Sequence, residues 1–226
     1  MVQNGEKMNS AVIQLLVLAA IAIFLILRLK NVLGTRDGFE KPPLASPARP
    51  AGGRRLEVVE GGGPDRDITD HVAEGSAAAR ALAAMKRVEP SFNVTEFLGG
   101  ARGAYEMILM AFESGDIERI RPFLSDEVYQ AFSQVVDVRE KDGIRIDSSF
   151  VGVREMTLVD AEFDESTGIG EITVRFVGEL TSVVRDKDGR IVEGNPNEVK
   201  RQKDQWTFAR KMGAQDPNWQ LVATGG

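Results

Sequence analysis

Residues 94–112 carry apolar side chains at the spacing of an amphipathic helix. At 100° per residue these side chains fall within one arc of about 140°, the width of a stripe that faces a protein core. The apolar positions are Phe97, Leu98, Ala101, Ala104, Tyr105, Ile108, Leu109 and Phe112. The pattern predicts a helix with one buried face.

Two further helices follow the first one. Gly115 ends the first helix, and Asp116 is the expected N-cap of a short helix over residues 117–123. Ser125 is the expected cap of a third helix. The apolar side of that helix is formed by Val128, Phe132, Val135 and Val136. The three helices therefore need a common apolar partner.

The apolar pattern changes from helical to alternating after residue 143. Residues 171–180 alternate as a half-buried antiparallel strand does, and residues 202–212 and 219–224 predict two more strands. Within residues 150–163 the apolar positions change parity, which indicates a β-bulge or a strong bend. Helices followed by a curved antiparallel sheet predict an α+β fold. The inward strand positions that can be assigned carry no carboxylate and include Ile172, Val174, Phe176, Leu180, Trp206 and Phe208.

Residues 11–27 form an uncharged, apolar run near the N-terminus. As a helix this run spans about 26 Å, and the long side chains of Arg28 and Lys30 extend it toward the roughly 30 Å of a bilayer core. We predict a retained transmembrane helix over residues 11–30, with a cleaved signal peptide as the alternative. More basic residues follow this span than precede it, which favours a cytoplasmic C-terminal domain at a cell inner membrane.

The sequence divides into five segments. Residues 1–10 form an N-terminal tail, and residues 11–30 form the membrane anchor. Residues 31–73 are rich in Pro, Gly and basic residues without an apolar period, which is typical of a flexible linker. Residues 74–91 are alanine-rich and predict a helical arm that either packs on the domain or contacts lipid or a partner. Residues 92–226 form the folded domain.

The net charge of −6 is distributed unevenly along the chain. Residues 28–55 contain seven basic residues and two carboxylates, whereas residues 56–226 carry a net −11. An acidic domain repels phosphates, so we expect no nucleic-acid partner. The basic segment suits anionic lipid, although a solvated linker explains it equally well. The candidate lipid contacts are Arg28, Lys30 and Arg36.

The sequence offers little for catalysis. It has no cysteine and a single histidine, His71, so thiol chemistry and multi-histidine metal sites are not expected. Tyr105 and Tyr129 are placed where either could face a pocket, but a buried tyrosine hydrogen-bonded to its surroundings is the commoner case. The acidic residues near 160–165 lack metal-loop spacing and suit a solvated turn. We therefore predict no catalytic residue, no metal and no cofactor.

Two sets of residues are candidates for the core or for binding. Gly99, Gly100 and Gly103 lie off the apolar stripe, so either another helix or bound segment approaches closely there, or the helix begins only at Ala101. The candidate partner contacts are Gly99, Gly103, Met107 and Met110. Methionine adapts to binding surfaces, which favours the last two. The expected core or pocket residues are Tyr105, Ile108, Phe112, Phe132, Phe176, Trp206, Phe208 and Trp219.

Several local motifs resemble the C-terminal domain of the Tim44 family. They are FLGGA at residues 97–101, AYE at 104–106, WTF at 206–208 and DPNW at 216–219. The resemblance implies a cone-shaped fold similar to nuclear transport factor two, with helices closing over a curved sheet around an apolar pocket. Mitochondrial relatives tether a chaperone motor to the presequence translocase. TimA-like alphaproteobacterial relatives have one N-terminal span and a cytoplasmic domain, and the layout of this chain is similar to theirs.

These observations lead to three functional expectations. The favoured one is a non-enzymatic, membrane-anchored adaptor that binds a protein or lipid partner at the cytoplasmic face of the inner membrane. The resemblance implies that this adaptor acts in protein translocation or membrane-protein assembly. One alternative is a periplasmic scaffold subunit of a secretion complex, which the flanking charges oppose. The other is a carrier or enzyme that holds an apolar ligand in its pocket.

Overall fold

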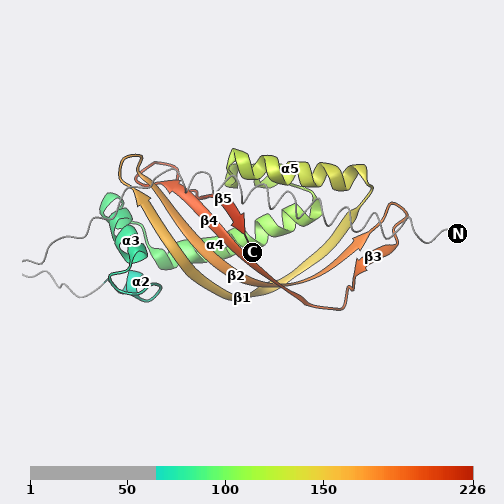
Figure 1. The fold of residues 1–226 in the computed structure, drawn as a ribbon, viewed down its shortest axis with the longest axis horizontal. Helices are drawn as coiled ribbons and strands as arrows, with labels where there is room; N and C mark the ends of the chain where they lie inside the picture. Colours follow the sequence, from blue (N-terminus) through green and yellow to red (C-terminus); the bar gives the residue numbers. More distant parts are fainter. Residues whose placement is uncertain (1–64, 226) are drawn as a thin grey trace, which may run out of the picture. The chain divides into compact units, whose positions relative to one another are not determined.

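The computed structural model describes residues 65–225 (Figure 1). The expected tail, the span at 11–30 and the candidate lipid contacts Arg28, Lys30 and Arg36 lie outside these residues. In the described part of the chain, no helix is long and apolar enough to cross a membrane.

The predicted helices are confirmed with local corrections, and one further helix, α2 (Arg66–Thr69), lies in the segment predicted to be a flexible linker. The others are α3 (Ala77–Val88), α4 (Val94–Ser114), the 3-10 helix η1 (Glu118–Phe123) and α5 (Asp126–Lys141). The Asn93 and Ser125 side chains cap α4 and α5, and Gly115 ends α4 with φ 82°. Asp116 does not cap η1, because Ile117 occupies the N-cap position with helical backbone angles and no side-chain hydrogen bond.

The strands form one antiparallel sheet in the order β1-β2-β4-β5, and β3 pairs with β2. Their bounds are β1 (Arg145–Asp164), β2 (Ile169–Arg185), β3 (Ile191–Gly194), β4 (Lys200–Lys211) and β5 (Gln220–Gly225). The sheet is strongly curved, and α4 and α5 lie on its concave side (Figure 1). Helices packed on a curved antiparallel sheet confirm the predicted α+β architecture.

The parity change in β1 comes from three register shifts against β2. The residues left without a β2 partner are Val151, Arg154 and Val159. Each shift adds a residue to the edge strand, which increases the local bend and twist. The predicted bulge is therefore confirmed, and it recurs along a strand that would otherwise present a long regular edge.

The core lies between α4 and the sheet. The ring of Tyr105 stacks on Phe176 at 4.4 Å between centroids and lies 4.8 Å from the ring of Trp206. Of the eight expected core or pocket residues, Tyr105, Ile108, Phe176, Trp206 and Phe208 are buried. Phe112, Phe132 and Trp219 are partly buried against this core, and the first two pair at 4.5 Å between α4 and α5.

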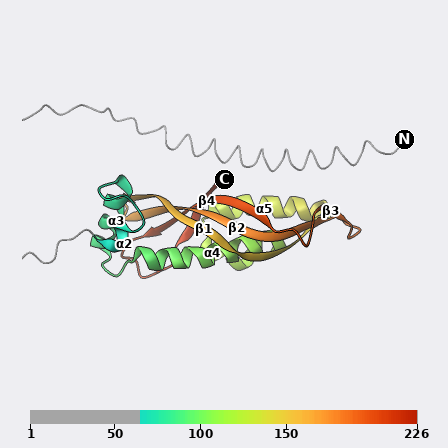
Figure 2. The same cartoon turned by 90° about the horizontal axis from the view of Figure 1, so that it is seen from below.

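Helix α3 packs on the domain. Its Leu82 and Met85 are fully buried, and a Cβ added at Gly170 of β2 would lie only 2.9 Å from Met85 Cε. Helix α2 falls within residues 31–73 and buries Ile68 in the same core. Figure 1 and Figure 2 both place α2 and α3 at one end of the domain and β3 at the other.

Candidate functional site

A groove with a volume of about 450 Å³ opens beside the N-terminal half of α4. One wall is α4 itself, and the opposite side is formed by the end of η1 and by the turn between β4 and β5. The connection between α3 and α4 closes one end. Residues on its surface include Ser91, Asn93, Glu96, Gly100, Gly103, Met107, Phe123, Pro217 and Trp219, and its deeper residues include Phe97, Ala101, Phe208 and Arg210.

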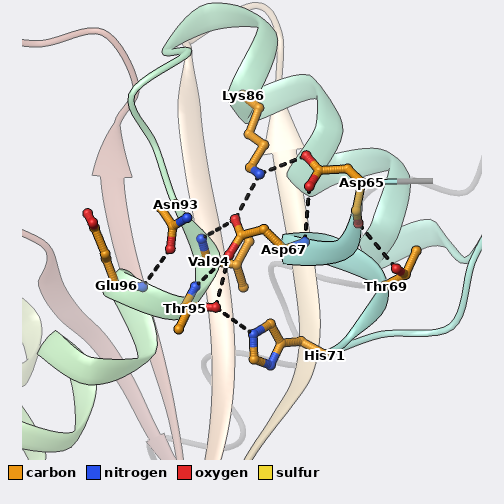
Figure 3. A network of polar contacts seen from close by, with 9 residues as sticks. All are labelled: Asp65, Asp67, Thr69, His71, Lys86, Asn93, Val94, Thr95 and Glu96. Atoms are coloured by element: carbon orange, nitrogen blue, oxygen red, sulfur yellow. Dashed lines mark hydrogen bonds and ion pairs between the residues drawn. The ribbon is translucent and has the colours of Figure 1, made fainter. Parts of the chain in front are cut away.

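The Asp67 carboxylate fixes the start of α4 (Figure 3). It accepts hydrogen bonds from the backbone N–H groups of Val94 at 2.7 Å and Thr95 at 3.0 Å. The Lys86 ammonium of α3 lies 2.7 Å away and also contacts Asp65. Burial acts to raise the pKa of Asp67, but these donors outweigh it and lower the pKa to about 2. One carboxylate thus joins α2, α3 and the positive end of α4.

A second carboxylate, Glu89, anchors the same connection from the other side. Arg210 Nη2 of β4 lies 2.8 Å from both Glu89 oxygens, and the Gly213 backbone N–H donates to Glu89 at 2.9 Å. Burial opposes ionisation of Glu89, yet these donors hold its pKa below the ordinary value. The α3–α4 connection is therefore held at both ends, by Glu89 after α3 and by Asp67 at the start of α4.

Aromatic rings line the groove from its surface to its deep side. Trp219 lies edge-on to Phe97 at 4.7 Å between centroids and tilted to Phe92 at 5.9 Å. The Arg210 guanidinium lies 5.2 Å from the Trp219 ring centroid. Trp219 therefore shapes this surface, whereas Phe208 lies beneath it, packed edge-on against Phe97 at 6.1 Å.

The helical wall of the groove carries glycine at two positions one turn apart, Gly100 and Gly103. Helix α4 is continuous from Val94, so the interpretation that it begins only at Ala101 is wrong. A Cβ built at Gly99, Gly100 or Gly103 would meet no atom of the described structure within 4 Å. Gly100 and Gly103 line the groove with the half-buried Met107, whereas Gly99 and Met110 are not among its lining residues.

The concave side of the sheet does carry one carboxylate, and the sequence reasoning missed it. Asp204 lies in β4 two residues before the inward Trp206, and its carboxylate accepts a 2.6 Å hydrogen bond from the Tyr105 hydroxyl. Burial, followed by this hydrogen bond and the charge of Asp204, raises the pKa of Tyr105. Burial also raises the pKa of Asp204. Tyr105 is fully buried among aromatic rings, which suits a structural contact.

The other candidate chemical groups lie at the surface. The Tyr129 hydroxyl donates to Glu118, and Arg121 lies over its ring at 4.1 Å. Asp164 accepts from the backbone and hydroxyl of Ser166 within its own turn. Within residues 65–225, no group of three or more His, Asp or Glu side chains is positioned to hold a metal ion.

The helices and the curved antiparallel sheet make this an α+β domain, and its sequence matches a known family of such domains. Residues 78–226 match the Tim44-like domain, and the chain belongs to that family. The match includes α3, which the sequence alone had placed in an arm outside the domain.

The curated relatives are mitochondrial import proteins. The chain is 22% identical over 167 residues to the human mitochondrial import inner membrane translocase subunit TIM44, covering 70% of this chain and 36% of the relative. It is 20% identical over 143 residues to TIM44-1 of Arabidopsis thaliana, covering 63% and 30% respectively. The chain thus matches about a third of the length of these relatives. The intermembrane space region of the chloroplast protein ARC6 is similar at a TM-score of 0.38 and 9% identity, covering 57% of this chain and 94% of that one.

Proposed function

We propose that this protein is a non-enzymatic adaptor, anchored in an inner membrane by residues 11–30, whose domain captures a protein partner through the α4 groove. Its proposed setting is protein translocation or membrane-protein assembly at the cytoplasmic face. The names of the relatives support the setting, since they are subunits of an inner-membrane translocase.

The single observation that carries the proposal is the construction of the groove. Two anchored carboxylates hold its end wall, while the half-buried Met107, Phe123 and Trp219 leave apolar surface accessible along its length. A rigid, partly apolar surface with a polar rim is what a protein contact needs, because little ordering is lost when the partner binds.

Substitution of Met107 tests the capture of a partner. Met107→Glu places a charge in the groove at a half-exposed position, so the domain should remain folded while co-purification of cross-linked partner from solubilised membranes falls. Val151→Glu is the matched control, because Val151 is 58% exposed on β1 and lies outside the groove. Equal capture by the wild-type chain and a stably folded Met107→Glu variant would contradict the proposal.

The anchor and its orientation need a separate test. The chain has no cysteine, so single cysteines at Ser46 and at Ser166 in the β1–β2 turn report topology cleanly. We expect an impermeant maleimide to label both only after the inner membrane is permeabilised. Labelling once only the outer barrier is opened would instead support a periplasmic scaffold.

A further inference from the structure

The exposed face of α4 carries the spacing of a helix–helix seam. Glu96, Gly100, Gly103 and Met107 follow one another at intervals of four, three and four residues, and all four line the groove. This alternation keeps one stripe facing a second helix, as in the contact line of a coiled coil.

The two central seam positions favour a close approach of the second helix. Gly100 and Gly103 are exposed, have ordinary helical backbone, and have no neighbour where a Cβ would point. Each glycine costs a helix about 1 kcal/mol relative to alanine, and no contact within residues 65–225 offsets this cost. Small residues at such positions let two helix backbones approach more closely than the usual 8–10 Å.

An independent observation points to a ligand that offers a hydrogen-bond acceptor. The Arg210 side chain is only 7% exposed and belongs to the groove, and its Nε atom is buried without a hydrogen-bond partner in the described structure. The ion pair with Glu89 already compensates the charge of the guanidinium, so its unpaired Nε–H group suits an uncharged acceptor. The last turn of a helix has such acceptors, because its carbonyl groups lack intrahelical partners.

We propose that the occupant of the groove is an α-helix of the partner protein, with small residues on its packing face and basic residues beside them. Its small residues lie against Gly100 and Gly103, and the carbonyls of its last turn face Arg210. The basic residues match Glu96 at the rim of the groove and the net −11 of residues 56–226. This inference rests on the proposed adaptor function and adds the form and composition of the partner.

Designed helical peptides of about twenty residues test the inference directly. The first has alanine at every seam position and lysine at the flanking positions, the second has leucine at the seam, and the third has glutamate in place of lysine. Binding of each labelled peptide to the full chain in mild detergent is measured by fluorescence anisotropy. We expect the alanine–lysine peptide to bind at least about tenfold more tightly than either of the others.

Two variants of the chain form a matched pair. Gly103→Leu fills the groove and should weaken binding of the alanine–lysine peptide by at least about tenfold, whereas Gly99→Leu should change it by less than about twofold. Both positions are exposed on α4 with open space around them, but only Gly103 lines the groove. Equal effects of the two substitutions, or equal binding of the alanine and leucine peptides, would overturn the inference.

The remaining outcomes separate this inference from the adaptor function. If no peptide binds while Met107→Glu still abolishes capture of the native partner, the helical occupant is wrong and the adaptor stands. If the chain self-associates and Gly103→Leu abolishes this, a second copy is the occupant and the assignment to a partner protein fails. Native mass spectrometry that finds an apolar small molecule, lost in Gly103→Leu, would overturn both.

Discussion

The two faces of α4 are built in opposite ways. On the inner face, Tyr105 and Ile108 are at most 1% exposed and pack against the aromatic core. On the outer face, Gly100 and Gly103 are exposed, and a Cβ added at either position would meet no atom within 4 Å outside the neighbouring backbone of α4. Burial of the inner face stabilises the fold. Each glycine on the outer face instead lowers the stability of the helix by about 1 kcal/mol relative to alanine. The difference agrees with the proposal that the outer face binds a partner.

The largest effect is expected on the inner face. Tyr105→Ala removes a ring that stacks on Phe176 and should lower the free energy of unfolding by about 3–5 kcal/mol, since a buried cavity remains. Chemical denaturation followed by tryptophan fluorescence measures this loss. A decrease below about 1 kcal/mol would show that α4 is not the helix on which the core depends.

The end wall of the groove should be nearly as sensitive. Glu89→Ala leaves the buried Arg210 guanidinium without its carboxylate and should cost about 3 kcal/mol. Asp188→Ala removes a carboxylate from an exposed pair with Arg190 and should cost less than about 1 kcal/mol. Thermal denaturation measures the loss of unfolding free energy in each variant. Similar losses would mean that the Glu89 anchor is no stronger than a surface contact.

Local patterns sufficed to predict α4, β2 and β4, because burial of one face imposes a period on consecutive residues. Alternation also placed Trp206 and Phe208 inward. The change of parity of the apolar positions within residues 150–163 predicted a bulge in β1. Asp204 has the inward parity of Trp206 and Phe208, but it was missed because it lies in the polar stretch at the start of β4, where a carboxylate is expected to face solvent. Its partner Tyr105 is 99 residues away in the sequence.

The groove itself was only partly predictable. The sequence singled out Gly103 and Met107, which line it, but also Gly99 and Met110, which are not among its lining residues. Its end wall depends on contacts such as that between Glu89 and Arg210, which are 121 residues apart. Such pairs leave no local pattern, since either residue alone reads as an ordinary surface charge.

The Asp67 anchor gives a pH-dependent test. Its folded-state pKa of about 2 lies below the ordinary value of 3.8, so its contribution is complete above that value and is lost as the pH falls toward 2. The contribution amounts to at most about 2 kcal/mol, because solvent screens a partly exposed carboxylate. Urea denaturation should therefore show a gap between the free energies of unfolding of the wild-type chain and Asp67→Asn. This gap should be present at pH 7 and close near pH 2. A gap independent of pH would contradict an ionised cap on α4.

The most direct test of the account measures stability and binding on the same variant. Gly100→Ala combined with Gly103→Ala should raise the free energy of unfolding by about 1–2 kcal/mol, because alanine favours the helix and meets no neighbour. The same variant should capture less of the cross-linked partner, whereas Gly99→Ala should gain stability without this loss. Increased stability with undiminished capture would contradict the claim that the outer face of α4 is kept bare for a partner.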